Sequence, residues 1–168
     1  FLSAETCQQL VDRSETLAYE TFTVDGLTVG YRNNARVVHD NPELANTLWQ
    51  RARAFLPSAI EQQQASGVNP RCRFYRYRGN EAFAAHYDGS VRIGGLQSKL
   101  TFMAYLNDVA QGGETRFYGP GSGELCEVRP ECGKALVFDH LVLHEGVAVR
   151  EGVKYVLRTD VMYGEPAR

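Results

Sequence analysis

From residue 71 onward the chain is a succession of short segments with the composition of β-strands, separated by glycine-rich connections. The segments, which are rich in aromatic and β-branched residues, are RCRFYRYR (71–78), SKLTFMAYLND (98–108), CGKALVFDH (132–140) and KYVLRTDVMY (154–163). The predicted loops are GSVRIGGLQ (89–97), QGGETRFYGPGSGE (111–124) and RPECG (129–133). No helical pattern intervenes, which argues against a parallel βαβ sheet and favours an antiparallel sandwich or barrel.

The first part of the chain, residues 1–60, has helical periodicity instead. Ser3 is the expected N-cap of a helix that runs to about Tyr19. A second helix is expected after a short extended piece, with Asn41 as its N-cap, Pro42 in its first turn and Pro57 at its end. With a β core over residues 70–165, the pattern predicts an α+β, mainly β protein whose N-terminal helices pack outside a sandwich.

Length and composition predict a single domain over residues 1–168, because 168 residues with 43% hydrophobic content suit one core. The net charge of -2 offers no basic stripe, so nucleic acid and anionic membranes are poor candidate partners. No apolar run approaches the roughly 18 residues of a membrane span. The start at Phe1, already inside a helical pattern, is typical of an excised domain. The absence of an N-x-[ST] site favours a cytoplasmic location.

The four cysteines lack the C-x-x-C spacing of zinc and redox sites. We expect mostly buried thiols, with Cys126 and Cys132 able to approach each other across a turn.

His86 and Asp88, in FAAHYDGS, would point to the same face of a strand. The pair is either a surface hydrogen bond or two thirds of a metal site. A third ligand would come from FDHLVLHEG, which contains His140 and His144, whereas His39 lies outside the β region. Two imidazoles and a carboxylate on one octahedral face are typical of non-haem Fe(II). A closed zinc site usually has four ligands.

Lys154 and Arg158 fall on one face of a later strand. Non-haem iron of this kind commonly uses 2-oxoglutarate, whose far carboxylate needs a buried cation. The alternative is an exposed basic edge that limits aggregation.

Taken in order, these segments resemble the Fe(II)/2-oxoglutarate dioxygenase superfamily, and within it the prolyl 4-hydroxylase-like branch. The resemblance runs from FLSAETCQQLV to the last strand. It depends on RFYRYRGNEAFAAHYDGS, LTFMAYLND, GGETRFY, GKALVFDHLVLHEG and GVKYVLRTDVMY. It implies a double-stranded β-helix, the jelly-roll of cupin-like proteins.

The resemblance assigns His86, Asp88 and His144 as iron ligands. Lys154, ten positions after His144, matches the residue that binds the C5 carboxylate of 2-oxoglutarate. Arg158 is its rival, and is otherwise assigned a supporting role.

Tyr77 and Tyr105 match tyrosines of the cosubstrate pocket, and aromatic core packing is the alternative for both. The HEG context favours His144 over His140 as the ligand. His140 would then face substrate or support a ligand.

The implied activity is hydroxylation of a C–H bond in a peptidyl residue, such as proline, or in a small molecule. Fe(II), 2-oxoglutarate and O₂ are required, with ascorbate as a reductant, and succinate and CO₂ are released. The alternative is a non-catalytic cupin-like module that binds a metal or ligand. The complete triad with a following cation favours the enzyme. Asp88 argues against a related halogenase, which needs an open position for chloride where this carboxylate stands. Zinc hydrolysis with the same three ligands would not explain Lys154 and the tyrosines.

Candidate substrate contacts lie in GYRNNARVV, where Asn34 and Arg36 could reach over the mouth of the barrel or form a polar strand edge. The glycine-rich loops at residues 89–97 and 118–123 are candidate lids or ordinary hairpin connections.

Overall fold

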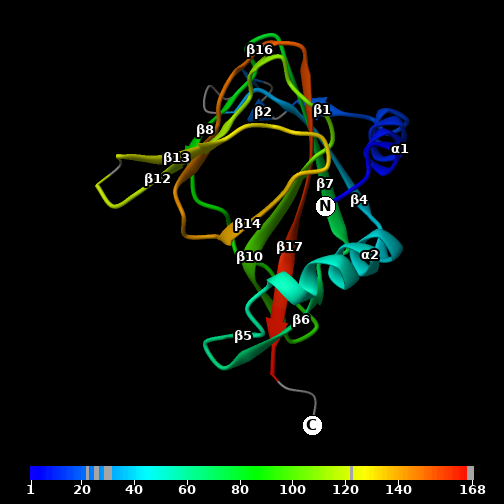
Figure 1. Cartoon of the computed structure of the whole chain (residues 1–168), viewed down its shortest axis with the longest axis vertical. Helices are drawn as coiled ribbons and strands as arrows, with labels where there is room; N and C mark the ends of the chain where they lie inside the picture. The colour runs from blue at the N-terminus through cyan, green and yellow to red at the C-terminus, as the bar shows by residue number, and fades with distance from the viewer. Residues whose placement is uncertain (22, 25–26, 29–31, 122, 166–168) are drawn as a thin grey trace.

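Two β-sheets form the body of the protein, shown here as a computed structural model that describes residues 1–21, 23–24, 27–28, 32–121 and 123–165 (Figure 1). Over these residues the larger sheet has nine strands. Its main path is β1 (Glu20–Thr21), β4 (Ala35–Asp40), β7 (Arg71–Arg78), β17 (Val153–Gly164), β10 (Leu96–Tyr105) and β14 (Ala135–Asp139). Beside β17 lies β6 (Gln63–Val68), which pairs with β5 (Ala59–Ile60), and beside β10 lies β9 (Arg92–Ile93).

The smaller sheet has the order β13 (Glu124–Val128), β12 (Thr115–Tyr118), β15 (His144–Gly146) and β8 (Phe83–His86). Two short ribbons pair β11 (Gln111–Gly112) with β16 (Val149–Glu151), and β2 (Thr23–Val24) with β3 (Leu27–Thr28). Every pair among the described strands is antiparallel, as predicted. The two sheets contact each other where Phe117 of β12 packs edge-on against Phe138 of β14, with ring centroids 5.0 Å apart.

The two helices are α1 (Ala4–Glu15) and α2 (Pro42–Ala52), each started by the predicted cap. Ser3 Oγ accepts the backbone N–H of Thr6 at 3.1 Å, and Asn41 Oδ1 accepts that of Leu44 at 2.9 Å. Both helices lie on the outer face of the larger sheet, away from the smaller sheet (Figure 1). Within the described part of the chain, no helix has the length and apolarity needed to cross a bilayer.

The helix ends differ from the prediction. The helix α1 stops at Glu15 rather than near Tyr19. Its last turn is closed by the hydroxyl of Thr16, which donates to the carbonyl of Arg13 at 2.7 Å. The helix α2 ends at Ala52 and continues as a 3₁₀ turn, η1 (Arg53–Phe55). The turn stops before Leu56, which is extended because it precedes Pro57.

Two strand assignments also differ. The segment 1–60 is not only helical, since β1 to β5 lie within it. Three of these strands, β1, β4 and β5, belong to the larger sheet, so that sheet does not begin at residue 70. Residues 115–118, predicted as loop, form β12. Their flanking glycines concealed a strand whose alternate residues Thr115 and Phe117 are buried.

All four cysteines are free thiols, and Cys7 and Cys72 are buried as expected. Cys132 contacts Cys7 and not Cys126, which is exposed on β13. Burial, and to a smaller extent the thiol of Cys132, raise the pKa of Cys7 to about 11.

Alternation along two central strands decides which side chains meet between the sheets. On β10, Phe102 and Ala104 join the apolar cluster under the helices, whereas Met103 and Tyr105 belong to a separate cluster on the inner face. On β17, Lys154 and Arg158 share the inner face, as predicted, and line a cavity between the sheets.

Candidate metal centre

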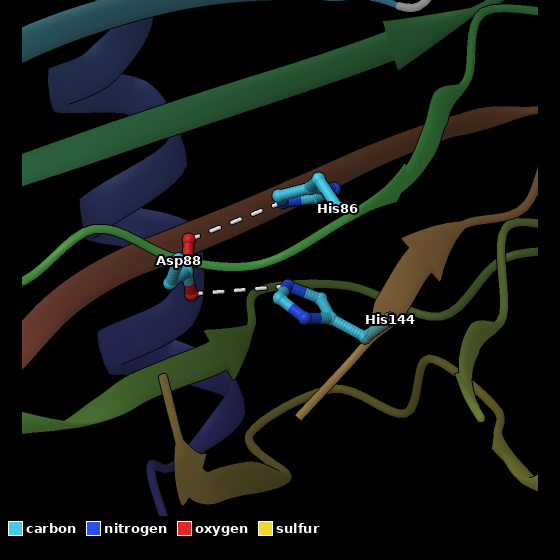
Figure 2. A group of neighbouring side chains, drawn as sticks. All are labelled: His86, Asp88 and His144. Carbon is cyan, nitrogen blue, oxygen red and sulfur yellow. Dashed lines mark ion pairs between the residues drawn. The ribbon is translucent and has the colours of Figure 1, made fainter. Parts of the chain in front are cut away.

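Three predicted ligands meet at one end of the smaller sheet. His144 of β15 and His86 of β8 are direct register partners, and Asp88 follows two residues after β8. Each residue offers a ligand atom, and these atoms all lie within 4.8 Å of one another. Figure 2 shows both imidazoles pointing at the Asp88 carboxylate. A single ion could therefore contact all three.

The two histidines present the correct nitrogen. His86 Nδ1 lies 2.8 Å from the carbonyl of Ala84, and His144 Nδ1 lies 2.9 Å from that of Val142. A carbonyl only accepts, so each Nδ1 carries the proton and each Nε2 keeps its lone pair for a metal. The Nε2 atoms lie 3.9 Å and 3.8 Å from the two oxygens of Asp88.

Burial keeps both imidazoles neutral. It is the main cause that lowers the pKa of His86 to about 4, with His144 as a further cause, and it lowers the pKa of His144 in the same direction. Neutral imidazole is the form that binds a metal.

Asp88 is held as a carboxylate. Its Oδ1 accepts from Arg158 Nη2 at 3.1 Å, its Oδ2 accepts from the hydroxyl of Thr101, and its backbone N–H donates to the carbonyl of His140 at 3.0 Å. Burial alone would raise the pKa of Asp88, but Arg158, Thr101 and the imidazoles outweigh it and lower the pKa.

Aromatic rings hold the two histidines in place. Phe83 stacks on His86 with centroids 3.7 Å apart, and Phe138 packs edge-on against His144 at 4.7 Å. These phenylalanines were not predicted from the sequence, because aromatic residues in strands are common core residues.

Lys154 lines the same cavity as the ligands and is the register partner of Tyr77 on β7. The cavity has about 440 Å³ of empty space when its open mouth is included. The ammonium lies 5.0 Å from the ring centroid of Tyr77 and 5.4 Å from that of Tyr105. Among the described residues no carboxylate lies within 4 Å of it. Burial lowers the pKa of Lys154 to about 7. The charge of Glu114 opposes this shift from a distance, but the ammonium lacks a carboxylate in direct contact, which a ligand could supply.

Arg158, the rival cation, is engaged elsewhere. Its Nη2 lies 3.1 Å from Asp88 Oδ1 and 3.1 Å from Asp160 Oδ1. Asp160 in turn contacts Arg73 at 3.2 Å and Asn69 at 3.1 Å. Arg158 thus supports the ligand Asp88 by holding its carboxylate, and Asp160 holds Arg158 in turn.

The two predicted pocket tyrosines differ. Tyr77 lines the cavity beside Lys154. Tyr105 is fully buried behind the lysine, with its hydroxyl 2.7 Å from Thr115 Oγ1 and 3.1 Å from the carbonyl of Val128.

The candidate substrate residues are not brought to the cavity. Asn34 is buried, and its amide accepts from Arg32 Nε at 3.2 Å and donates to the carbonyl of Ala35 at 3.1 Å. Arg36 lies on β4 opposite Tyr75, and neither Asn34 nor Arg36 is among the described residues that line the cavity. Positions 30 and 31 of GYRNNARVV and position 122 of the loop 118–123 lie outside the described residues.

His140 also lies away from the cavity lining, buried behind Asp88, which corresponds to the supporting alternative rather than to substrate contact. Thr101, which contacts Asp88, was missed. Alternation could have identified it, because Thr101 shares the face of Met103 and Tyr105 in an otherwise apolar strand.

The loop 89–97 contains β9 and turns through Gly94 and Gly95, whose φ values of +54° and +83° favour glycine. It is a hairpin between β9 and β10. Its role as a lid stays a prediction.

A family model described as "2OG-Fe(II) oxygenase superfamily" matches residues 72–159, just over half of the chain. "Probable prolyl 4-hydroxylase 3" of Arabidopsis thaliana is 28% identical over 189 aligned positions, which cover 92% of this chain and 64% of the relative. The chain thus spans slightly less than two thirds of that relative.

Solved structures share the fold. The 2OG complex of viral collagen prolyl hydroxylase from Paramecium Bursaria Chlorella virus-1 matches with a TM-score of 0.69 and 21% identity, covering 96% of this chain and 91% of the other. A Pseudomonas putida prolyl-4-hydroxylase matches with a TM-score of 0.70 and 18% identity, covering 99% and 90%. A Trichoplax adhaerens prolyl hydroxylase, in complex with a hypoxia inducible factor peptide, gives 0.70 and 17%, covering 95% and 78%. These matches confirm the predicted double-stranded β-helix.

Proposed function

The chain belongs to the 2OG-Fe(II) oxygenase superfamily, and from this premise we propose that it is an Fe(II)- and 2-oxoglutarate-dependent dioxygenase that hydroxylates a peptidyl residue, with prolyl as the first candidate. One observation carries the proposal. A carboxylate and two neutral imidazoles converge within 4.8 Å, in the cavity that also holds the buried ammonium of Lys154.

The residues present fit the proposed groups. His86, Asp88 and His144 would hold Fe(II) through two nitrogens and one oxygen, the donor set of a facial triad. Lys154 would bind the C5 carboxylate of 2-oxoglutarate, and Tyr77 would cover its carbon chain. When bound, the iron and 2-oxoglutarate supply the oxidising chemistry, which consumes O₂, releases succinate and CO₂ and leaves a hydroxyl group on the substrate.

The protein's own groups bind, orient and exclude water. Arg158 and Thr101 fix the carboxylate of Asp88, while Phe83 and Phe138 restrain the imidazoles. The rings also reduce the access of water to the centre, which limits side reactions. No side chain is required as a nucleophile or general base, because the proposed cofactors carry the chemistry.

The substrate class is inferred from the relatives named above, which are prolyl hydroxylases, one of them in complex with a peptide fragment.

The first test is an anaerobic titration of metal-free protein with Fe(II) and then 2-oxoglutarate. We expect the visible absorption band of a 2-oxo acid chelated to Fe(II), and we expect His144→Ala to lose it. His39→Ala is the matched control, because His39 lies on β4 and outside the cavity lining. Folded wild-type protein that binds Fe(II) without forming this band would instead favour the non-catalytic binding module.

The second test is turnover, measured as succinate released in the presence of ascorbate and a proline-containing peptide. A matched peptide with alanine in place of proline is the control. Stimulation by the first peptide alone supports prolyl hydroxylation. Equal rates with both peptides and with none would contradict a prolyl substrate and direct the search to small molecules.

A further inference from the structure

The hydroxyl of Thr101 lies between the ligand Asp88 and the side chain of His140. Thr101 Oγ1 donates to Asp88 Oδ2 and lies 2.9 Å from His140 Nδ1. His140 and Thr101 are almost completely buried, with exposed fractions of 4% and 1%. The contact is therefore shielded from solvent and belongs to the interior of the protein.

The donors and acceptors of this contact can be assigned from chemistry alone. A carboxylate oxygen only accepts, so the single proton of the Thr101 hydroxyl is used on Asp88. His140 Nδ1 must then carry a proton and donate it to Thr101 Oγ1. Arg158 Nη2, at 3.4 Å, is a second donor to the same oxygen. With two donors and one acceptor around it, the hydroxyl has one favourable orientation.

The main chain of His140 supports Asp88 as well. Its carbonyl accepts the backbone N–H of Asp88 at 3.0 Å. One residue therefore contacts both the backbone of this metal ligand and, through one hydroxyl, its carboxylate.

Further hydrogen bonds connect His140 to the hairpin of residues 89–97. His140 Nε2 lies 2.9 Å from Ser98 Oγ, which accepts the backbone N–H of Val91 at 2.9 Å. The carbonyl of Ser98 accepts from Ser90 Oγ at 2.8 Å. Ser90 and Val91 are the residues through which the chain leaves Asp88 for β9.

We propose that His140 is a positioning residue for the metal centre. Through Thr101 it fixes the orientation of the Asp88 carboxylate, and through Ser98 it couples that carboxylate to the hairpin of residues 89–97. This inference rests on the proposed function, because Asp88 must be a metal ligand for its orientation to matter. Hydrogen-bonded partners of metal ligands typically contribute about 10–100-fold in metal affinity or activity.

The test measures Co(II) binding, because Co(II) is stable in air and its absorption spectrum reports ligand geometry. His140→Leu removes the donor, Thr101→Val removes the hydroxyl at constant shape, and His140→Asn keeps an N–H near the position of Nδ1. His39→Leu is the matched control. Thermal unfolding of each metal-free variant is recorded alongside.

We expect His140→Leu and Thr101→Val to weaken Co(II) binding about 10–100-fold and to alter the Co(II) spectrum. His140→Asn should retain the wild-type spectrum with affinity within about threefold of the wild type. A purely structural role would lower the unfolding temperature of both His140 variants and leave the spectrum unchanged. If His140→Leu does not fold, Thr101→Val is compared with Thr101→Ser, which keeps the hydroxyl.

Wild-type spectrum and affinity in both Thr101→Val and His140→Leu would overturn the positioning role and leave the proposed function intact. Equal losses in His140→Asn and His140→Leu would overturn it too, because the donor would not be the cause. Wild-type protein that does not bind Co(II) or Fe(II) at all would overturn both proposals together.

Discussion

The two faces of the larger sheet are built from the same strands and both contain almost completely buried side chains, yet they differ in chemistry. On the outer face, Phe74, Phe102 and Leu157 pack with side chains of α1 and α2 in an apolar cluster. On the inner face, Thr101 and Lys154 have exposed fractions of 1% and 2%. The two faces therefore differ in the elements that cover them, and burial alone does not distinguish them.

The helices cover the outer face with apolar side chains, so that face contributes mainly stability. The smaller sheet covers the inner face and leaves a cavity lined by ionisable groups. Arg158 forms ion pairs with Asp88 and Asp160, whereas the ammonium of Lys154 has no carboxylate in direct contact among the described residues. Substitutions on the outer face should thus change folding. Substitutions on the inner face should change binding, and they should also change folding where they remove or unpair a buried charge.

The largest effect is expected for Phe102→Ala on the outer face. Removing a ring that is 0% exposed should reduce the free energy of unfolding by about 3–5 kcal/mol, because it leaves a cavity under the helices. Denaturant unfolding measures the loss. The folded protein should still form the Fe(II)/2-oxoglutarate absorption band, and loss of that band at full stability would break the distinction between the faces.

Arg158→Leu should reduce the free energy of unfolding by about 3 kcal/mol, because it leaves the buried Asp160 with fewer positive partners. The double variant Arg158→Leu/Asp160→Asn removes the excess charge and should recover at least half of that loss in denaturant unfolding. If Arg158→Leu mainly raises the 2-oxoglutarate requirement instead, then Arg158, and not Lys154, is the cosubstrate anchor.

Lys154→Met should weaken 2-oxoglutarate binding by about 2 kcal/mol, roughly 30-fold, by removing one partner of a buried charge pair. It should also raise the stability of the ligand-free protein. Burial lowers the pKa of Lys154 to about 7 in the folded state, so the folded protein binds fewer protons than the unfolded chain between pH 7 and about 10. The buried lysine therefore opposes folding in that range, and the opposition fades as the pH rises.

For Lys154→Met, anaerobic titration gives the affinity and thermal unfolding at pH 8 gives the stability. Lys134→Met, which removes a surface lysine paired with Glu131, is the control. Unchanged affinity for 2-oxoglutarate in Lys154→Met would contradict the assignment.

The smallest effect is a pH dependence of cosubstrate affinity. Because burial lowers the pKa of Lys154 to about 7 in the ligand-free protein, its side chain is mostly a neutral amine at higher pH and must take up a proton to pair with a carboxylate. Affinity for 2-oxoglutarate should therefore fall about tenfold between pH 7 and pH 8.5. Lys154→Arg, whose guanidinium stays charged, should show a flatter profile, and parallel profiles would exclude Lys154 as the titrating group.

Local signals predicted much of this fold. The caps Ser3 and Asn41 act within one helical turn, so both helix starts were correct, and the segment 71–78 coincides with β7. The strand β12 was missed because its identity depends on pairing with β13 and β15, which are distant in sequence or separated from it by glycine. The extended segment containing β4 was likewise recruited to the larger sheet by pairing with β7.

The sequence by itself determined that Lys154 and Arg158 share a face, because alternation along a strand is a local property. It also identified His86, Asp88 and His144 as candidate ligands through their spacing and their resemblance to a family. Only the tertiary structure decided that Arg158 lies between two carboxylates while Lys154 has no carboxylate within 4 Å among the described residues. The physical reason is that the pairing of buried charges, like the hydrogen bond from Thr101 to Asp88, joins strands whose positions are set only when the sheets pack.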